Sequence, residues 1–227
     1  MIETRVISIG AIAAHPLWNE RAAVRTGHAT TTLIRTKDAT IVVDPGLPPA
    51  MVMARLGERA AITPEKVTHV FLTSFRPDVR RGIEAFGDAR WMIHEPERET
   101  VGANLVELIK NAKDNNDDEL VEMLAHDVAV LKRCEPAPDT IAHHVDLFPL
   151  PGVTPGLCGL LVAGPSDTTL VCGDAIPTIE HLEQGKVLPS AVDIAAAKES
   201  LMEAVEIADL LVLGRDNIVK TPGRQSF

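Results

Sequence analysis

The sequence has few aromatic residues: five Phe, two Trp and no Tyr among 227 residues. The core must therefore be built mainly from Ala, Val, Leu and Ile, and a binding surface based on tyrosine is excluded. Cysteine is also scarce, with three residues in the chain. These residues, Cys134, Cys158 and Cys172, are far apart and odd in number. Their spacing fits neither a disulfide framework nor a C-x-x-C motif, and it favours a reducing compartment.

Positive charge is in deficit, with 22 Lys and Arg against 32 Asp and Glu and a formal net charge of −10. This balance argues against nucleic acid and anionic membranes as partners, since both require a surplus of basic residues. No apolar run approaches the roughly 20 residues of a membrane span. The first residues, 1–18, lack the basic flank and apolar run of a signal peptide. We expect a cytoplasmic protein, and the sequence predicts no oligomeric state.

The hydrophobic content of 45% over 227 residues is enough for one sizeable core. No linker or change in composition divides the chain, so we predict a single domain, 1–227. Apolar runs between breakers predict strands at 5–12, 30–35, 40–43, 67–73, 90–93, 145–150, 157–163, 168–172 and 210–213. Helical spacing predicts helices at 48–57, 79–86 and 191–207, with two more inside 95–134. This order is typical of mixed sheets sandwiched between helices.

The two helices inside 95–134 are separated by a polar stretch at 113–119. We interpret this stretch as a solvated loop rather than a cation site, because it lacks a calcium-loop glycine pattern. An apolar stripe on the second helix is assigned to the core. Its members are Leu120, Met123, Leu124, Val128 and Leu131.

Five segments, in order, carry a resemblance to a known family: TTLIRTKDATIVVDPGLPP, VTHVFLTSFRPDVRRGIEAF, FPLPGVTPG, LVCGDAIP and ADLLVLGRDNI. They resemble, in the same order, the conserved segments of metallo-β-lactamase-fold hydrolases. The resemblance covers most of the chain. It implies an α/β (α+β) fold, a four-layer αββα sandwich of two mixed β-sheets flanked by helices.

In the resembled family, histidines and carboxylates at strand ends bind one or two Zn²⁺ ions, which activate a water molecule. Carried over residue by residue, the H-x-H-x-D-H motif corresponds to Ser74, Arg76, Asp78 and Val79, the histidine of Gly-His-Thr to Val153, the bridging aspartate to Asp174, and the last histidine to Arg215. Both carboxylates are kept, and every histidine position holds another residue. These seven residues are therefore expected to be vestigial metal-site positions.

The residues that replace the histidines do not suit zinc. Valine offers no ligand atom, serine is a poor one, and arginine is a permanent cation. We therefore expect no cofactor and no confirmed catalytic residue. The alternative is a divergent mononuclear zinc site in which Asp78 and Asp174 are joined by a displaced histidine, His28 or His15.

Without metal, Asp78 and Asp174 would face each other unpaired, which is costly in a buried site. We predict that at least one of Arg76 and Arg215 supplies the missing positive charge by pairing with a carboxylate. The alternative is that both arginines are surface residues on degenerate loops. Ser74 is open to two further interpretations, a nucleophile without an evident base or a cap for the loop of Asp78.

Three functions are compatible with this pattern. The first is a zinc-free, non-hydrolytic relative that keeps a pocket for a small, anionic ligand or a partner. The second is an active hydrolase with a rearranged metal site, or with acid–base chemistry on Asp78 and Asp174. The third is a structural or subunit-interaction protein. Arg76, Arg80 and Arg81 form a basic cluster that could attract an anion to the pocket mouth or simply be a solvated helix start.

Overall fold

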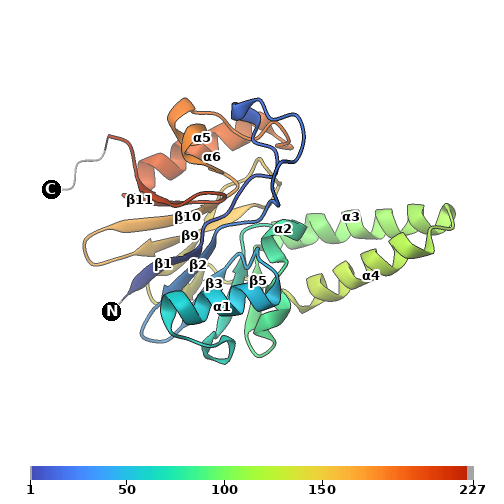
Figure 1. Ribbon diagram of the computed structural model, residues 1–227, viewed down its shortest axis with the longest axis horizontal. Helices are drawn as coiled ribbons and strands as arrows, with labels where there is room; N and C mark the ends of the chain where they lie inside the picture. Colours follow the sequence, from blue (N-terminus) through green and yellow to red (C-terminus); the bar gives the residue numbers. More distant parts are fainter. Residues whose placement is uncertain (1, 224–227) are drawn as a thin grey trace.

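The computed structural model describes residues 2–223, and Met1 and residues 224–227 lie outside the described part. It contains two six-stranded sheets with helices on their outer sides (Figure 1). The first sheet has the order β1 (Glu3–Ser8), β2 (Thr31–Arg35), β3 (Thr40–Val43), β4 (His69–Leu72), β5 (Arg90–Ile93) and β6 (Glu135–Pro136). The second has the order β12 (Ile218–Lys220), β11 (Leu210–Leu213), β10 (Thr168–Gly173), β9 (Cys158–Ala163), β8 (Val145–Pro149) and β7 (Thr140–Ala142). The helices are α1 (Pro49–Ala60), α2 (Pro77–Arg80), α3 (Glu95–Asp114), α4 (Asp118–Arg133), α5 (Ile179–Gln184) and α6 (Ile194–Ile207).

Both sheets are mixed. In the first, β1, β2 and β3 are antiparallel, and β3, β4, β5 and β6 are parallel. In the second, β10 and β11 form the parallel pair, and the other neighbours are antiparallel. Parallel neighbours need a crossover, which α1 supplies between β3 and β4 and which α5 and α6 supply between β10 and β11. The carboxyl ends of parallel neighbours therefore lie at the same edge.

The layer between the sheets is almost entirely aliphatic. Phe71 and Met92 of the first sheet share one buried cluster with Leu160 and Val171 of the second. Phe71 is the one aromatic residue of that cluster among the described residues. The two sheets therefore pack face to face with helices outside, which confirms the predicted αββα sandwich.

Helix α6 covers the outer face of the second sheet. Leu201 packs in one cluster with Leu170 of β10 and Leu211 of β11. The predicted start of this helix, residue 191, is too early. The Asp193 carboxylate accepts two backbone N–H groups at 2.9 and 3.0 Å, so the helix begins at Ile194.

Helices α3 and α4 form a hairpin that projects from the sandwich (Figure 1). The prediction of two helices is confirmed, but the connection is narrower than the polar stretch 113–119 suggested. Asp117 caps α4 by accepting the Leu120 N–H at 3.0 Å, so only residues 115–117 lie outside the helices. The polar composition of this stretch did not indicate which of its residues caps α4.

The predicted apolar stripe of α4 is only partly core. Leu124 and Leu131 are buried, and Leu120 and Val128 are partly buried against the same cluster. Met123 is 58% exposed, so its assignment to the core is wrong. The reason is the projection of the hairpin, which leaves α4 covered mainly by α3.

The predicted helix at 79–86 is interrupted. It consists of α2 and a separate 3₁₀ turn, Ile83–Phe86. Between them the Gly82 N–H donates to the Pro45 carbonyl at 2.7 Å, and a side chain at Gly82 would lie 2.4 Å from a backbone oxygen. The chain leaves the helical path here because it must pass close to the loop after β3.

Several short elements were not predicted, namely β6, β7, β12 and α5. The strands among them are only two or three residues long, which is too short for a periodic signal. The first strand also ends at Ser8 rather than residue 12, because the Gly10 N–H turns to the Thr30 hydroxyl at 2.9 Å.

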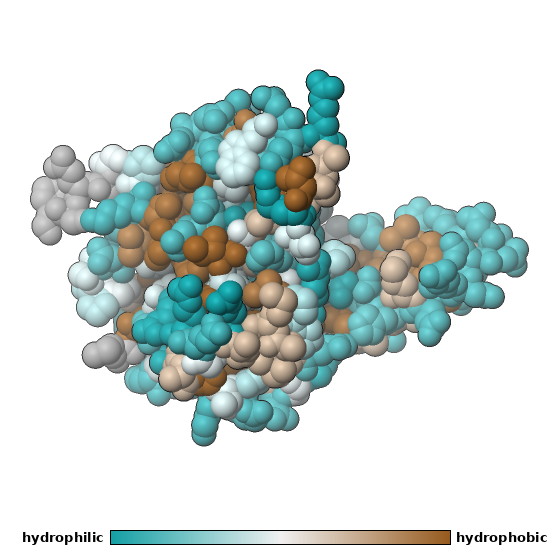
Figure 2. Space-filling view, viewed as in Figure 1, coloured by the Kyte–Doolittle hydropathy of each residue, from teal (hydrophilic) through white to brown (hydrophobic). Residues whose placement is uncertain are grey.

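Polar residues dominate the face shown in Figure 2, including the projecting hairpin, and apolar residues gather in separate patches over the sandwich. Within residues 2–223, no helix has the length and apolar character needed to cross a membrane.

Candidate functional site

Three strand ends bring the predicted site residues to one edge of the sandwich. The segment 74–78, which leads into α2, follows β4, Asp174 follows β10 and Arg215 follows β11. Because β10 and β11 are parallel neighbours, Asp174 and Arg215 leave the sheet on the same side. The fold therefore places the two residues together before any side-chain contact is considered.

Two glycines allow these loops to approach closely. Gly173 has φ +53°, and a side chain there would lie 2.5 Å from the Thr73 hydroxyl. A side chain at Gly214 would lie 2.3 Å from the Gly173 carbonyl oxygen. Any other residue at either position would push the strand ends apart.

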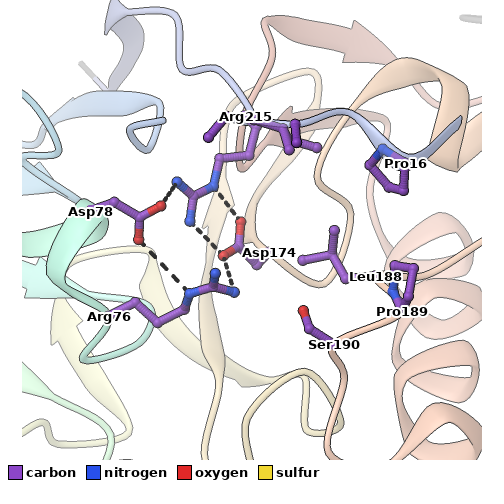
Figure 3. Close-up of a pocket in the computed structure, with 11 residues that line it drawn as sticks. Pro16, Arg76, Asp78, Asp174, Leu188, Pro189, Ser190 and Arg215 are labelled. Carbon is purple, nitrogen blue, oxygen red and sulfur yellow. Dashed lines mark hydrogen bonds and ion pairs between the residues drawn. The ribbon is translucent and has the colours of Figure 1, made fainter. Parts of the chain in front are cut away.

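Arg215 is the centre of the site (Figure 3). Its Nε and Nη2 each donate to one oxygen of Asp174 at 2.7 Å, and its Nη1 donates to Asp78. The side chains of Arg215 and Asp174 are only 4% and 2% exposed. The prediction that an arginine pairs with the carboxylates is confirmed, and the alternative of a surface residue is wrong for Arg215.

The charges in this cluster stabilise one another. Burial alone would raise the pKa of Asp174, but the guanidinium of Arg215, with help from Arg76, outweighs it and holds that pKa below its usual value. Burial alone would lower the pKa of Arg215, but Asp174 and Asp78 raise it instead. Asp174 and Arg215 are therefore both ionised at neutral pH.

Arg76 joins the cluster more loosely. Its Nη1 lies 3.3 Å from Asp174 Oδ2, and its Nε lies 3.8 Å from Asp78 Oδ1. Its side chain is 37% exposed, against 4% for Arg215. Arg76 is thus a second, more accessible cation on the outer side of the carboxylate pair.

Asp44 fixes the position of Thr73, the residue that follows β4. It has φ +51°, and its carboxylate accepts both the Thr73 N–H at 2.8 Å and the Thr73 hydroxyl at 2.7 Å. Burial raises the pKa of Asp44 to about 7, although the hydrogen bonds from Thr73 oppose this. This support was not identified from the sequence.

Glu97, near the start of α3, joins two loops of the site. Its side chain accepts the Phe75 N–H at 3.0 Å, the Thr154 hydroxyl at 2.7 Å and the Gly156 N–H at 3.3 Å. The residue is 1% exposed. Glu97 therefore fixes the segment of Arg76 against the Gly-x-Thr-x-Gly segment.

The other predicted site positions do not face the cavity. Val79 and Val153 are 1% and 3% exposed and belong to apolar core clusters. Ser74 is fully buried, and its hydroxyl has no hydrogen-bond partner among the described residues. Its interpretation as a cap is therefore wrong, and within residues 2–223 no base lies within hydrogen-bond distance to activate it as a nucleophile.

The predicted basic cluster at the pocket mouth is also only partly formed. Arg80 is buried, donates to Asp127 of α4 at 2.5 Å and lies over the ring of Phe75. Arg81 is exposed but does not line the cavity. Arg76 is the member of the cluster that reaches the site.

A pair of buried histidines lies beside the site and was not predicted as a unit. His15 Nε2 and His181 Nδ1 both contact the Thr178 hydroxyl, at 3.1 and 2.9 Å. His15 Nδ1 and His181 Nε2 have no partner within the described residues. His28, the other histidine considered for a metal, contacts the backbone carbonyls of Thr26 and Ile9 instead.

Buried His181 predicts a dependence of stability on pH. Burial lowers the pKa of His181 to about 4, so between pH 6.5 and 4 the unfolded chain binds a proton that the folded chain does not. The stability contributed by neutral His181 is fully present above pH 6.5, is lost progressively as the pH falls from 6.5 to 4, and does not change further below pH 4. In urea denaturation, the free energy of unfolding of the wild type should fall by about 2 kcal/mol more than that of the His181→Leu variant between pH 6.5 and pH 4. Equal losses in the two proteins would contradict the prediction.

The cluster forms the floor of a cavity of ≈ 330 Å³. One wall is the loop 12–16, and the opposite wall contains Leu188, Pro189 and Ser190 (Figure 3). The walls are mainly apolar, and the charged groups lie at one end. This combination is typical of a small-molecule site with a polar anchor.

The residues present do not fit the zinc ions that the fold family implies. Both oxygens of Asp174 accept hydrogen bonds from Arg215, whose guanidinium also contacts Asp78. Within residues 2–223, no three His, Cys, Asp or Glu side chains are grouped so that they could hold a metal ion. A guanidinium beside both carboxylates would also repel a divalent cation.

Comparison with solved structures agrees with this architecture. A Thermotoga maritima protein classed with the metallo-β-lactamases has 17% identity and a TM-score of 0.68, covering 96% of this chain and 99% of its own. AidC, a dizinc quorum-quenching lactonase, has 17% identity and a TM-score of 0.67, over 100% of this chain and 92% of its own. The hydrolase AbOPH of the β-lactamase superfamily has 13% identity and a TM-score of 0.64, over 100% and 92%.

No model of a known protein family and no curated protein sequence matches the chain. The identities to solved structures are low, so those structures establish the fold rather than an activity. The chain has the metallo-β-lactamase fold.

Proposed function

We propose that this chain is a metal-independent binding protein that holds a small anionic ligand in its cavity and does not hydrolyse it. The observation that carries the proposal is the position of Arg215, which occupies the space between Asp78 and Asp174 and donates to both. By the resemblance described above, these three positions correspond to metal-ligand positions in zinc hydrolases. A guanidinium here would supply the charge that the metals supply there.

The chemistry of the remaining groups supports a non-hydrolytic role. Asp174 is held ionised by Arg215, so it cannot donate a proton to a leaving group. Its lowered pKa also makes it a weak base. Ser74 is fully buried, and in the described part of the chain its hydroxyl has no base beside it. None of these groups provides the activated nucleophile that hydrolysis requires.

The proposal treats residues 1–227 as one domain in the cytoplasm. The three cysteine thiols are buried and unpaired, and burial raises the pKa of Cys134 to about 11 and that of Cys158 to about 12. Unpaired thiols are compatible with a reducing compartment. The net charge of −10 supports the absence of nucleic-acid and membrane partners.

Metal analysis of protein purified without chelator tests the proposal directly. We expect less than one tenth of an equivalent of zinc, iron or manganese per chain, and no change in Tm on addition of EDTA. AidC, which is described as a dizinc lactonase, would serve as the positive control. Stoichiometric metal would contradict the proposal and favour the alternative of a hydrolase with a rearranged metal site.

An activity assay completes this test. Some of the structural neighbours are described as N-acyl homoserine lactone lactonases or hydrolases. We expect no turnover of an N-acyl homoserine lactone by this chain, with or without added Zn²⁺. Zinc-dependent turnover that is lost in the Asp174→Asn variant would overturn the proposal. If no small anion binds, the alternative of a structural or subunit-interaction protein is favoured.

A further inference from the structure

The two arginines of the cluster differ in how many donors they have left for a ligand. Arg215 directs Nε, Nη1 and Nη2 at carboxylate oxygens of the protein. Its side chain is 4% exposed. Arg215 therefore neutralises the two aspartates and has little capacity to contact a bound molecule.

Arg76 is in the opposite situation. Its contacts with Asp174 and Asp78, at 3.3 and 3.8 Å, are ion pairs, and within the described residues it makes no hydrogen bond to either. Figure 3 shows its guanidinium on the side of the cluster that faces Ser190. A planar guanidinium with free N–H groups can bind a carboxylate through two parallel hydrogen bonds. Arg76 is thus the anchor available to a ligand.

The charge of the cluster limits the charge of that ligand. Arg76 and Arg215 balance Asp78 and Asp174, so the floor of the cavity is neutral before a ligand enters. A monoanion that contacts Arg76 adds one negative charge close to a carboxylate pair that is already neutralised. A dianion would add a second negative charge with no further cation to meet it. The cluster therefore favours a carboxylate over a phosphate dianion.

The walls indicate what the rest of the ligand is like. Beyond Arg76, the cavity is bounded by Ile12, Ala13, Pro16 and Leu188, and these offer hydrocarbon surface. An apolar chain gains free energy in such surroundings, in proportion to the area removed from water. The ≈ 330 Å³ volume limits this chain to a small size.

We propose that the cavity binds a short amphiphilic monocarboxylate, with its carboxylate on the Arg76 guanidinium and its apolar chain between loop 12–16 and residues 188–189. This deepens the proposed function and rests on it. Arg76 is a binding residue, and Arg215 is a positioning residue that keeps both aspartates neutralised while the anchor stays free.

Isothermal titration calorimetry of the full chain with hexanoate tests this proposal. We expect hexanoate to bind the wild type and to bind the Arg76→Ala variant at least about tenfold more weakly. Arg76→Lys should recover only part of the affinity, because an ammonium is a point charge without the planar fork. Arg81→Ala is the matched control: it removes the same charge from the same segment and should leave the affinity unchanged. Hexan-1-ol and inorganic phosphate should each bind at least about tenfold more weakly than hexanoate.

The possible failures are distinguishable. If metal-free protein binds phosphate through Arg76 more tightly than hexanoate, the anion-binding function stands and the monocarboxylate inference is overturned. If Arg76→Ala binds hexanoate like the wild type, or if hexanoate does not bind at all, the inference is overturned as well. Stoichiometric metal would instead overturn the proposed function itself. Circular dichroism and Tm measurements on Arg76→Ala establish that any loss of binding does not come from unfolding.

Discussion

Replacing Arg215 with Met lowers the free energy of unfolding by about 3–5 kcal/mol at pH 7 and low salt. The reason is the buried carboxylate that the substitution leaves behind. Asp174 is 2% exposed and takes both of its short hydrogen bonds from Arg215. Arg76 is too distant and too exposed to replace that bidentate contact. Urea denaturation followed by circular dichroism measures the loss.

Two variants control this experiment. Arg81→Met removes a charge of the same sign from an exposed position and should change stability by less than about 0.5 kcal/mol. The double variant Arg215→Met, Asp174→Leu should be more stable than Arg215→Met alone, because it removes the unpaired carboxylate together with its partner. A loss of under about 1 kcal/mol for Arg215→Met would mean that the pair contributes little and that water or another cation compensates.

Replacing Glu97 with Leu should lower the free energy of unfolding by about 3 kcal/mol or more, because three hydrogen-bond donors lose their acceptor together. Phe75 and Gly156 would leave their backbone N–H groups unpaired, and Thr154 would lose its partner. We also expect a second effect. The loop that carries Arg76 and the loop after β8 would no longer be tied together, so ligand binding should weaken beyond what the stability loss explains.

Glu99 offers a matched control for Glu97. It lies on the same helix two positions later and is exposed, so Glu99→Leu should be close to neutral. Glu97→Gln keeps one acceptor oxygen and should fall between the wild type and Glu97→Leu. Equal stability of Glu97→Leu and Glu99→Leu would show that the loops are held by packing alone.

Some elements could be read from the sequence residue by residue. Strands β3, β5 and β11 have the predicted bounds, 40–43, 90–93 and 210–213. Each contains a short run of buried apolar residues that ends at a polar residue or glycine, namely Asp44, His94 and Gly214. The short strands at the ends of the sheets carry no such pattern, because their pairing depends on neighbours distant in sequence.

The site was predictable in its charge balance but not in its details. Two carboxylates at strand ends require a counter-charge, and this argument predicted an arginine partner. It did not reveal that Arg80 would instead turn to Asp127, which lies 47 residues away on α4. Asp44 and Glu97 were missed for the same reason. Each accepts a backbone N–H from another segment, 29 and 22 residues away. Because almost every residue carries a backbone N–H, the sequence does not show which of these groups a carboxylate will bind.

The bidentate contact of Arg215 with Asp174 also bears on whether the proposed loss of the metal site can be reversed. Reintroducing histidine at position 215 alone would remove the partner of Asp174 before a complete metal site existed to replace it. By the resemblance, a full metal site would require further changes at Ser74, Arg76, Val79 and Val153, and all of these except Arg76 are buried. A mutational path that begins at position 215 would therefore pass through a less stable protein that still lacks a complete metal site. A single ion pair can in this way make an evolutionary change hard to undo.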